Sequence, residues 1–372
     1  MQRRRFIRGT PATRASFLAV AWAAWLLGCE SQGIPSQDHV KPDAGDRQDA
    51  TNPPDARDTT TWRSTVQAWI YPGPPACNAP AEYADGRVIH VLKPEYFTVA
   101  PEGTLRMILE ETDGCNGFSE KNAADVRAHS RIQLVTVSAG AEAMAALVGH
   151  APRRQEAVST LVSFVKRVQF SGVELDFEGF GKWTRNDYAG YLRFVEELGN
   201  ALHQEEQFLA VDGPAIESAS AQGNFQWRYE DFEALPVDQV IVMAYDYQYD
   251  YAAGSPVAPT EWVVQAVQWV KARISDSTRI AVGIPAYGYH GRPGQDLQID
   301  THFQSSRYPG YERAIRDARS FEMYWENDGQ SYFYVDSEGL NRKREAIEAQ
   351  GITTVSAWHL GGNQWFSGKR EP

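Results

Sequence analysis

Apolar and polar positions in this chain alternate with two different periods. Eight short runs rich in β-branched and aromatic residues have the period of a strand, and segments with the helical period lie between several of them. The predicted strands are residues 67–71, 87–92, 132–137, 172–177, 208–212, 240–245, 280–284 and 353–358. The clearest predicted helices cover residues 153–167, 187–203 and 260–273.

This alternation begins after Trp62 and continues for about 310 residues. Eight strands alternating with helices favour an α/β fold, the (β/α)8 TIM barrel. A doubly wound open sheet is the alternative, but no glycine-rich phosphate loop opens a helix here, which counts against its nucleotide-binding version. The stretch between the seventh and eighth strands, roughly 290–350, leaves room for only a short insertion.

The fourth predicted strand carries two interleaved sets of side chains. They are Val173, Leu175 and Phe177, and Glu174, Asp176 and Glu178. Side chains two apart in a strand point the same way, ~6–7 Å from each other. Three carboxylates therefore form a row on one face. Burying such a row is costly unless the groups share protons or hydrogen bonds, so it indicates chemistry more than a solvated acidic face.

The row resembles the signature of glycoside hydrolase family 18, Asp-Gly-x-x-x-Asp-x-Glu. Asp176 and Glu178 match it, whereas Ser171 and Glu174 stand where the family usually has Asp. Further phrases at predicted strand ends resemble family motifs in the right order: residues 138–140, 243–246 and 283–288, and a final Trp358. The resemblance covers residues 66–362. Residues 255–259 and 332–336 are similar to the spore-cortex-lytic branch, which acts on peptidoglycan.

The resemblance implies a retaining glycosidase in which the substrate's own 2-acetamido group is the nucleophile. It assigns Glu178 as general acid and base. Asp176 would orient the acetamido N–H and stabilise the oxazolinium ring, and Tyr245 would hold the acetamido oxygen. The implied substrate-binding residues are Trp358, Glu174, Asp246, Tyr247, Tyr287 and Met243. Of these, Trp358 would lie under the sugar, and Glu174 would keep Asp176 partly protonated.

The implied partner is a polysaccharide containing β-1,4-linked N-acetylglucosamine, of chitin or peptidoglycan type. The resemblance implies no cofactor and no metal, and the eight His show no metal-ligand spacing. A catalytically silent lectin of the same family, an endo-β-N-acetylglucosaminidase acting on N-glycan cores and a surface scaffold are alternatives. Such lectins usually lack the Glu that is present here as Glu178. We expect a monomer.

The N-terminal segment is predicted to be a targeting signal. Five Arg precede an apolar run over residues 17–27, too short for a comfortable membrane span. The run ends in Leu-Leu-Gly before Cys29, which resembles a bacterial lipobox and implies a lipoprotein signal peptide over 1–28 with lipid on Cys29. Ordinary secretion with an incidental Cys29 is the alternative. We expect the protein to be exported and lipid-anchored in the cell envelope, and Glu30 gives the outer membrane only a slight preference.

Composition divides the rest of the chain. Residues 29–62 are rich in Asp and Pro with almost no large apolar residue, which predicts a disordered tether before a catalytic barrel over 63–372. The full chain has 36 Lys and Arg against 48 Asp and Glu, a net charge of -12, and removal of five signal-peptide Arg makes it -17. A surface this acidic repels nucleic acid and anionic lipid, so membrane attachment would depend on the acyl chains.

Two cysteines remain besides Cys29. Cys77 and Cys115 both follow early predicted strands. An even pair in an exported domain favours one disulfide, with two separate free thiols as the alternative.

Overall fold

The computed structural model describes residues 65–85, 87, 89–251 and 253–367. The predicted signal peptide, Cys29 and the predicted tether lie outside the described residues. Within the described part, no helix is both long enough and apolar enough to cross a membrane.

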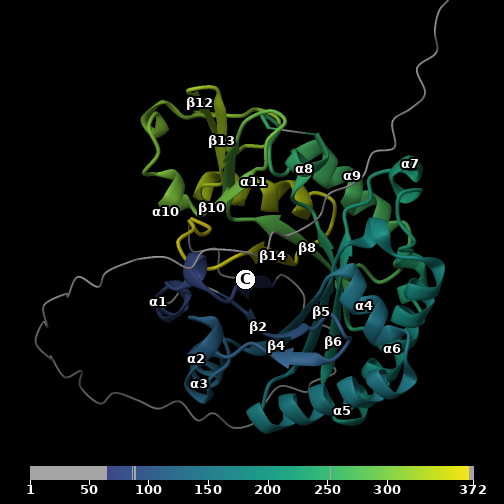
Figure 1. Ribbon diagram of the computed structural model, residues 1–372. Coiled ribbons are helices and arrows are strands. Elements are labelled where there is room, and N and C mark those ends of the chain that lie inside the picture. Colours follow the sequence, from purple (N-terminus) through teal and green to yellow (C-terminus); the bar gives the residue numbers. More distant parts are fainter. Residues whose placement is uncertain (1–64, 86, 88, 252, 368–372) are drawn as a thin grey trace, which may run out of the picture.

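Eight parallel strands close into a barrel (Figure 1). Their order is β1-β14-β8-β7-β6-β5-β4-β2, and β1 pairs with both β14 and β2 to complete the ring. The strands are β1 (Val66–Ile70), β2 (Val91–Val99), β4 (Ile132–Ala139), β5 (Gly172–Phe177), β6 (Phe208–Pro214), β7 (Gln239–Met243), β8 (Ile280–Pro285) and β14 (Val355–Trp358). The closed ring confirms the predicted (β/α)8 barrel and rules out an open sheet.

Helices connect most successive strands and cover the outside of the barrel (Figure 1). They are α1 (Ala79–Ala84), α2 (Glu110–Asp113), α3 (Glu120–Ala128), α4 (Ala141–Val148), α5 (Ala151–Val168), α6 (Arg185–Gln204), α7 (Ala219–Gln222), α8 (Tyr247–Tyr251), α9 (Thr260–Lys271) and α11 (Ser337–Glu348). The three predicted helices are α5, α6 and α9, each within two residues of its predicted bounds. Helix α6 begins with a capping box between Thr184 and Asp187, which fixes its start.

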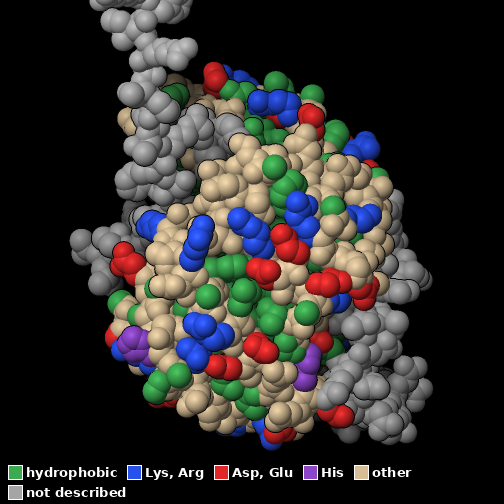
Figure 2. Space-filling model, turned by 90° about the vertical axis from the view of Figure 1, so that its right-hand side faces the viewer, with side chains coloured by type: hydrophobic (Ala, Val, Ile, Leu, Met, Phe, Trp, Pro, Cys, Tyr) green, Lys and Arg blue, Asp and Glu red, His purple; other side chains and the backbone are tan. Residues whose placement is uncertain are grey.

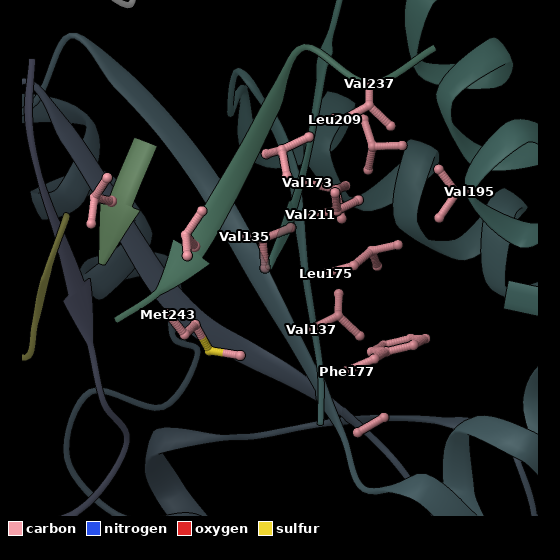
Figure 3. Close-up of a cluster of buried hydrophobic side chains, with 14 of the residues drawn as sticks. Val135, Val137, Val173, Leu175, Phe177, Val195, Leu209, Val211, Val237 and Met243 are labelled. Atoms are coloured by element: carbon pink, nitrogen blue, oxygen red, sulfur yellow. The ribbon is translucent and has the colours of Figure 1, made fainter. Parts of the chain in front are cut away.

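The hydrophobic core has two layers, one on each side of the barrel wall. Val173, Leu175 and Phe177 of β5 face outward and pack towards α6, as Figure 3 shows. A smaller apolar cluster fills the lumen and consists of Trp69, Val91, Ile132, Leu134, Phe208, Ala210, Ile241 and Ala281. Strand β5 is therefore largely buried on both faces. A Cβ added at Gly172 would stand 2.1 Å from the Phe208 carbonyl oxygen, so only glycine allows β5 to approach β6.

The second predicted strand is displaced from its real position. It was expected at residues 87–92, whereas β2 is Val91–Val99. The strand continues through Lys93 and Glu95 because their side chains reach polar partners inside the barrel, Glu174 and Ser138. A short strand β3 (Leu105–Met107) then pairs antiparallel with β2.

The insertion between β8 and β14 is a folded module for which the sequence pattern had predicted no strands. Its antiparallel sheet contains β9 (Gly288–Gly291), β10 (Gln298–Asp300), β11 (Ile315–Arg316), β12 (Met323–Asn327) and β13 (Gln330–Tyr334), accompanied by α10 (His302–Ser305). Trp325, Tyr332 and Tyr334 form a small buried cluster inside this module, separate from the barrel core. In Figure 1 the module stands at the upper left, beside the barrel strands.

The predicted disulfide between Cys77 and Cys115 is confirmed, with 5.4 Å between their Cα atoms. It joins the segment after β1 to the segment after α2, and the Gly73 amide reinforces it by donating to the Cys115 carbonyl at 2.7 Å. On the face drawn in Figure 2, basic and acidic side chains are interspersed with small apolar areas. That face therefore presents no extended field of one sign.

Candidate active site

The predicted carboxylate row lies in the lumen at the carboxyl end of β5. Asp176 is near the end of the strand and Glu178 follows it directly, and both are partly exposed. Glu174 lies deeper and is 0% exposed. Catalytic residues of such barrels stand at this end of the strands, so the row occupies the expected place.

Glu174 is held by three donors. Its carboxylate accepts from Trp69 Nε1 at 2.9 Å, from Lys93 Nζ at 2.6 Å and from Thr136 Oγ1 at 2.6 Å. The Lys93 ammonium also lies 3.3 Å from the centroid of the Trp69 ring. A carboxylate that accepts from a buried cation and two further donors is fixed in place. Glu174 therefore supports the site from beneath, below the surface that a sugar can touch.

Asp176 and Glu178 are the two carboxyls that face the open end. Burial, followed by the charge of Glu178, raises the pKa of Asp176 well above its usual range, although Lys93 opposes this. One oxygen of Asp176 is buried without a hydrogen-bond partner among the described residues. Burial, followed by the charges of Asp246 and Glu95, raises the pKa of Glu178 to about 7. A carboxyl that titrates near neutrality is suited to both donating and accepting a proton.

Glu95 is a site residue that the sequence analysis missed. It lies on β2 and accepts from Ser138 Oγ at 2.6 Å, and Ser138 is the β4 partner of Asp176 in the sheet register. Burial is the main cause that raises its pKa to about 7. The available signal was the alternation of Lys93 and Glu95 in an otherwise apolar run, the same pattern that marks β5.

Asp212 is a second missed carboxyl, on the lumen side of β6. It is 1% exposed, and its carboxyl lies close enough to that of Glu174 for a hydrogen bond between them when one of the two is protonated. Burial and then the charge of Glu174 raise its pKa well above the usual range, which favours the protonated form of Asp212 beside Glu174. We call the carboxyl side of the site the set of Lys93, Glu95, Glu174, Asp176, Glu178 and Asp212.

Three aromatic residues form the opposite wall, here called the aromatic side: Tyr245, Tyr287 and Trp358. The rings of Tyr287 and Trp358 meet edge to face at 4.9 Å, and the Tyr245 ring lies 6.5 Å from Trp358. A Cβ at Gly283 would be 3.0 Å from the Tyr245 ring, so this glycine makes room for it. Burial raises the pKa of the Tyr245 hydroxyl well above its usual range, which keeps it a hydrogen-bond donor.

The remaining predicted residues are divided between the site and its surroundings. Asp246 accepts a hydrogen bond from the Tyr287 hydroxyl and raises the pKa of Glu178, so it belongs to the site. The Tyr247 ring packs against Trp262 of α9 at 5.4 Å. Met243, at the end of β7, is 9% exposed and belongs to the hydrophobic core (Figure 3).

The arrangement combines a proton donor near neutral pH, a second carboxyl with a free oxygen, a phenolic donor and an aromatic wall. In the part of the chain that the structure describes, no group of three or more His, Cys, Asp or Glu is arranged to hold a metal ion. The fold and site together define a (β/α)8 barrel protein equipped for general acid–base chemistry on a ligand with an apolar face.

The chain belongs to the family described as Glycosyl hydrolases family 18, whose sequence profile matches residues 107–363. This confirms the resemblance seen in the strand-end motifs. A Bacillus subtilis protein named as a sporulation-specific glycosylase, YdhD, is 23% identical over 218 residues, covering 56% of this chain and 51% of YdhD. The B. subtilis glycosylase YvbX is 28% identical over 131 residues, covering 35% of this chain and 37% of YvbX. The chain thus spans about half, or less, of the length of these relatives.

Solved structures share the fold at low sequence identity. A chitinase from Chromobacterium violaceum ATCC 12472 superposes with a TM-score of 0.68 at 20% identity, covering 80% of this chain and 95% of that one. The spore cortex-lytic enzyme SleL of Bacillus cereus gives a TM-score of 0.65 at 16% identity, covering 81% and 72%. A tobacco class V chitinase in complex with NAG4 gives 0.66 at 15% identity, covering 81% and 94%.

Proposed function

We propose that this protein is a retaining glycosidase that hydrolyses β-1,4 bonds in glycans containing N-acetylglucosamine, by substrate-assisted catalysis. The observation that carries the proposal is Glu178, a carboxyl with a pKa of about 7 that stands next to Asp176 on the row. The charges of Asp176 and Glu178 both act on the Tyr245 hydroxyl, and the Tyr245 ring lies 6.5 Å from that of Trp358 on the aromatic side. Proton donor, charge stabiliser and sugar platform are thus present together.

In the first step, a sugar stacks on Trp358 and Glu178 gives its proton to the leaving glycosidic oxygen. The carbonyl oxygen of the substrate's 2-acetamido group attacks the anomeric carbon as that bond breaks. Asp176 accepts the acetamido N–H and stabilises the positive oxazolinium ring, while the Tyr245 hydroxyl donates to the acetamido oxygen. These contacts strengthen as charge develops, which lowers the barrier.

In the second step, Glu178 has become a carboxylate and takes a proton from water. The resulting hydroxide-like oxygen attacks the anomeric carbon and opens the oxazolinium ring. Two displacements at one carbon leave its configuration unchanged, and Glu178 returns to its protonated state.

The relatives support two substrate types. The tobacco chitinase was solved with an N-acetylglucosamine oligomer, and SleL is named for the lysis of spore cortex. Both names support a substrate of linked N-acetylamino sugars, which is what a mechanism that uses the acetamido group requires. We propose chitin-type and peptidoglycan-type strands as the candidates.

The proposal is tested by supplying the purified protein with chitin oligosaccharides and, separately, with peptidoglycan strands. Mass spectrometry identifies the cleaved bond, and proton NMR of the first product reports its anomeric configuration. We expect fragments with β configuration at the new reducing end. Tight binding without any cleavage would identify a lectin instead, and an α product would contradict the mechanism.

We also propose that the protein is anchored in the bacterial envelope by lipid on Cys29. The support is the Leu-Leu-Gly-Cys sequence after a charged and then apolar N-terminal run. Cys29→Ser should move the protein from the membrane fraction to the soluble fraction or leave it unprocessed. A variant that fractionates and migrates like the wild type would show that Cys29 carries no anchor.

A further inference from the structure

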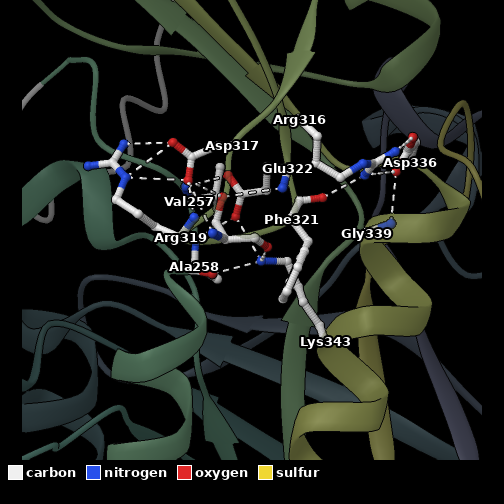
Figure 4. A network of polar contacts seen from close by, with 11 residues as sticks. Val257, Ala258, Arg316, Asp317, Arg319, Phe321, Glu322, Asp336, Gly339 and Lys343 are labelled. Atoms are coloured by element: carbon white, nitrogen blue, oxygen red, sulfur yellow. Dashed lines mark hydrogen bonds and ion pairs between the residues drawn. The ribbon is translucent and has the colours of Figure 1, made fainter.

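A second buried ion pair lies outside the catalytic centre, between the insertion module and α11. Lys343 Nζ is 2.8 Å from Glu322 Oε1, and the two side chains are 1% and 0% exposed. Figure 4 shows the pair at the centre of a polar network. Glu322 directly precedes β12, whereas Lys343 lies on α11, so the pair joins segments that are distant in sequence.

Most of the contacts of this pair go to the loop that follows β7. Glu322 accepts from the Val257 amide and from the Ala258 amide, each at 2.8 Å. Lys343 Nζ donates to the Ala258 carbonyl at 2.7 Å and to the Ser320 carbonyl at 2.9 Å. Both charges are thus satisfied mainly by the backbone of Val257 and Ala258, with the Ser320 carbonyl as one further partner of Lys343. Charge-assisted hydrogen bonds to consecutive backbone groups fix the conformation of a loop.

The loop continues to the catalytic centre through the backbone. The Tyr247 amide donates to the Val257 carbonyl at 3.0 Å, and Tyr247 directly follows Asp246. Asp246 has a φ of 68°, in the left-handed region, which is populated only when the surroundings hold it there. The Tyr289 hydroxyl provides a second tie, since it donates to the Ser255 carbonyl at 2.6 Å and accepts from the Gly254 amide at 3.0 Å.

We propose that Glu322 and Lys343 are a positioning pair that fixes the loop over 253–259 and thereby holds Asp246 beside Glu178. A buried ion pair adds little net stability compared with apolar residues of the same size. Its directional bonds to two consecutive amides do specify a single loop conformation. The insertion module therefore takes part in setting the catalytic acid, although it contributes no carboxyl to the row.

The consequence can be measured on Glu178. The ionisable groups around Glu178 come from three places: Asp176 on β5, Glu95 on β2, and Tyr245 and Asp246 after β7. Of these, only Tyr245 and Asp246 are close in sequence to the held loop, and Tyr245 stays neutral. The charge of Asp246 raises the pKa of Glu178, so its displacement lowers that pKa. An acid catalyst must be protonated, so the alkaline limb of the rate profile then moves to lower pH.

The test compares Glu322→Gln with a matched control, Asp336→Asn. Asp336 accepts two hydrogen bonds from Arg316, at 2.9 and 2.7 Å, and likewise joins the insertion to α11. The side-chain hydrogen bonds of Asp336 go to Arg316 and to Gly339, outside the loop over 253–259. Asn at this position still caps the N-terminus of α11. We expect Glu322→Gln to lower kcat on a chitin oligosaccharide about tenfold or more and to shift the alkaline limb. Asp336→Asn should leave the alkaline limb of the rate profile in place, even if its Tm falls by as much as that of Glu322→Gln.

A double variant distinguishes an effect through the position of Asp246 from a general loss of stability. In an Asp246→Asn background, Glu322→Gln should shift the limb no further, because the charge through which it acts is gone. A full additional shift there, or an unshifted limb in Glu322→Gln alone, would overturn the proposal. If Glu322→Gln does not fold, Tyr289→Phe removes the second tie to the same loop. Tyr289→Phe should also shift the alkaline limb to lower pH. An unchanged pH–rate profile in this variant would contradict the proposal.

This inference rests on Glu178 as the catalytic acid, so a readout without turnover is also needed. Carbon-13 NMR of labelled glutamate carboxyls follows the titration of Glu178 directly, with Glu178→Gln identifying its signal. The titration should move to lower pH in Glu322→Gln and stay in place in Asp336→Asn. A shifted titration in a protein without hydrolysis would reject the proposed function but keep the positioning pair. An unmoved titration would reject the pair.

Discussion

The two sides of the barrel mouth differ in the kind of side chain that they bury. The carboxyl side, on β2, β6 and β5 with the residue that follows it, holds five acids and one lysine, of which Lys93, Glu174 and Asp212 are closed off from water. The aromatic side presents Tyr245 and Tyr287, which follow β7 and β8, and Trp358 at the end of β14, and these rings pack against one another. Burying aromatic rings favours folding, whereas burying unpaired carboxyls opposes it.

The contrast shows where function has overridden stability. Lys93 and two neutral donors satisfy Glu174, and the raised pKa of Asp212 favours its neutral form, so the charge buried deep in the lumen is largely paired. Asp176 and Glu178 remain near the opening with raised pKa values, and one buried oxygen of Asp176 has no hydrogen-bond partner among the described residues. In our account the carboxyl side manages protons and the aromatic side binds the sugar. Variants on the two sides should therefore fail in different ways.

The largest effect is expected from the carboxyl side. Glu178→Gln keeps the shape of the side chain but cannot donate the proton, so kcat should fall by about 10²–10⁴-fold. Binding of a chitin oligosaccharide, measured by calorimetry, should change little because the aromatic side is intact. Undiminished hydrolysis by this variant would refute the assignment of the acid.

Removing the buried cation should be the largest effect on stability. Lys93→Met leaves Glu174 as an uncompensated buried charge, which costs about 3–5 kcal/mol of unfolding free energy. Asp212→Asn is the matched control, since burial favours the neutral form of this acid and its replacement by an amide should cost much less. Urea denaturation measures both. Equal losses in the two variants would contradict the assigned charges.

On the aromatic side, Trp358→Ala should raise Kd for the substrate by a larger factor than it lowers kcat. Loss of the large apolar face is expected to raise the Kd for a chitin oligosaccharide about tenfold. Trp269→Ala, on the outer helix α9, is the control and should bind normally. If Trp358→Ala lost kcat while keeping Kd, the division of labour between the two sides would be wrong.

The smallest predicted effect is a change in pH dependence. The pKa of Glu178 is about 7, and the acid form is the active one, so the rate should fall as pH rises through that value. The charge of Glu95 contributes to this raised pKa, and Glu95→Gln removes it. The alkaline limb should move to lower pH, whereas a move to higher pH would show that Glu95 does not act through charge.

Much of this site was predictable from the sequence because its signals are local. The β5 row follows from strict alternation within one strand, and the motifs after β7 and β8 are short and contiguous. Lys93 and Glu95 were missed because the second strand was placed too early, which left them outside it. Asp212 is a single acid in an apolar run. Glu322 and Lys343 meet only through the folded insertion, a long-range contact that no periodicity reveals.

The central claim is that the substrate's own acetamido group attacks, with Asp176 stabilising the ring that forms. It is tested most directly with a thiazoline analogue of that ring, measured as an inhibitor of the wild type and as a ligand of Asp176→Asn. We predict inhibition of the wild type and binding at least about tenfold weaker to the variant, because a charge-assisted contact to the ring is lost. Equal binding to both proteins, or no inhibition of an active wild type, would contradict the account.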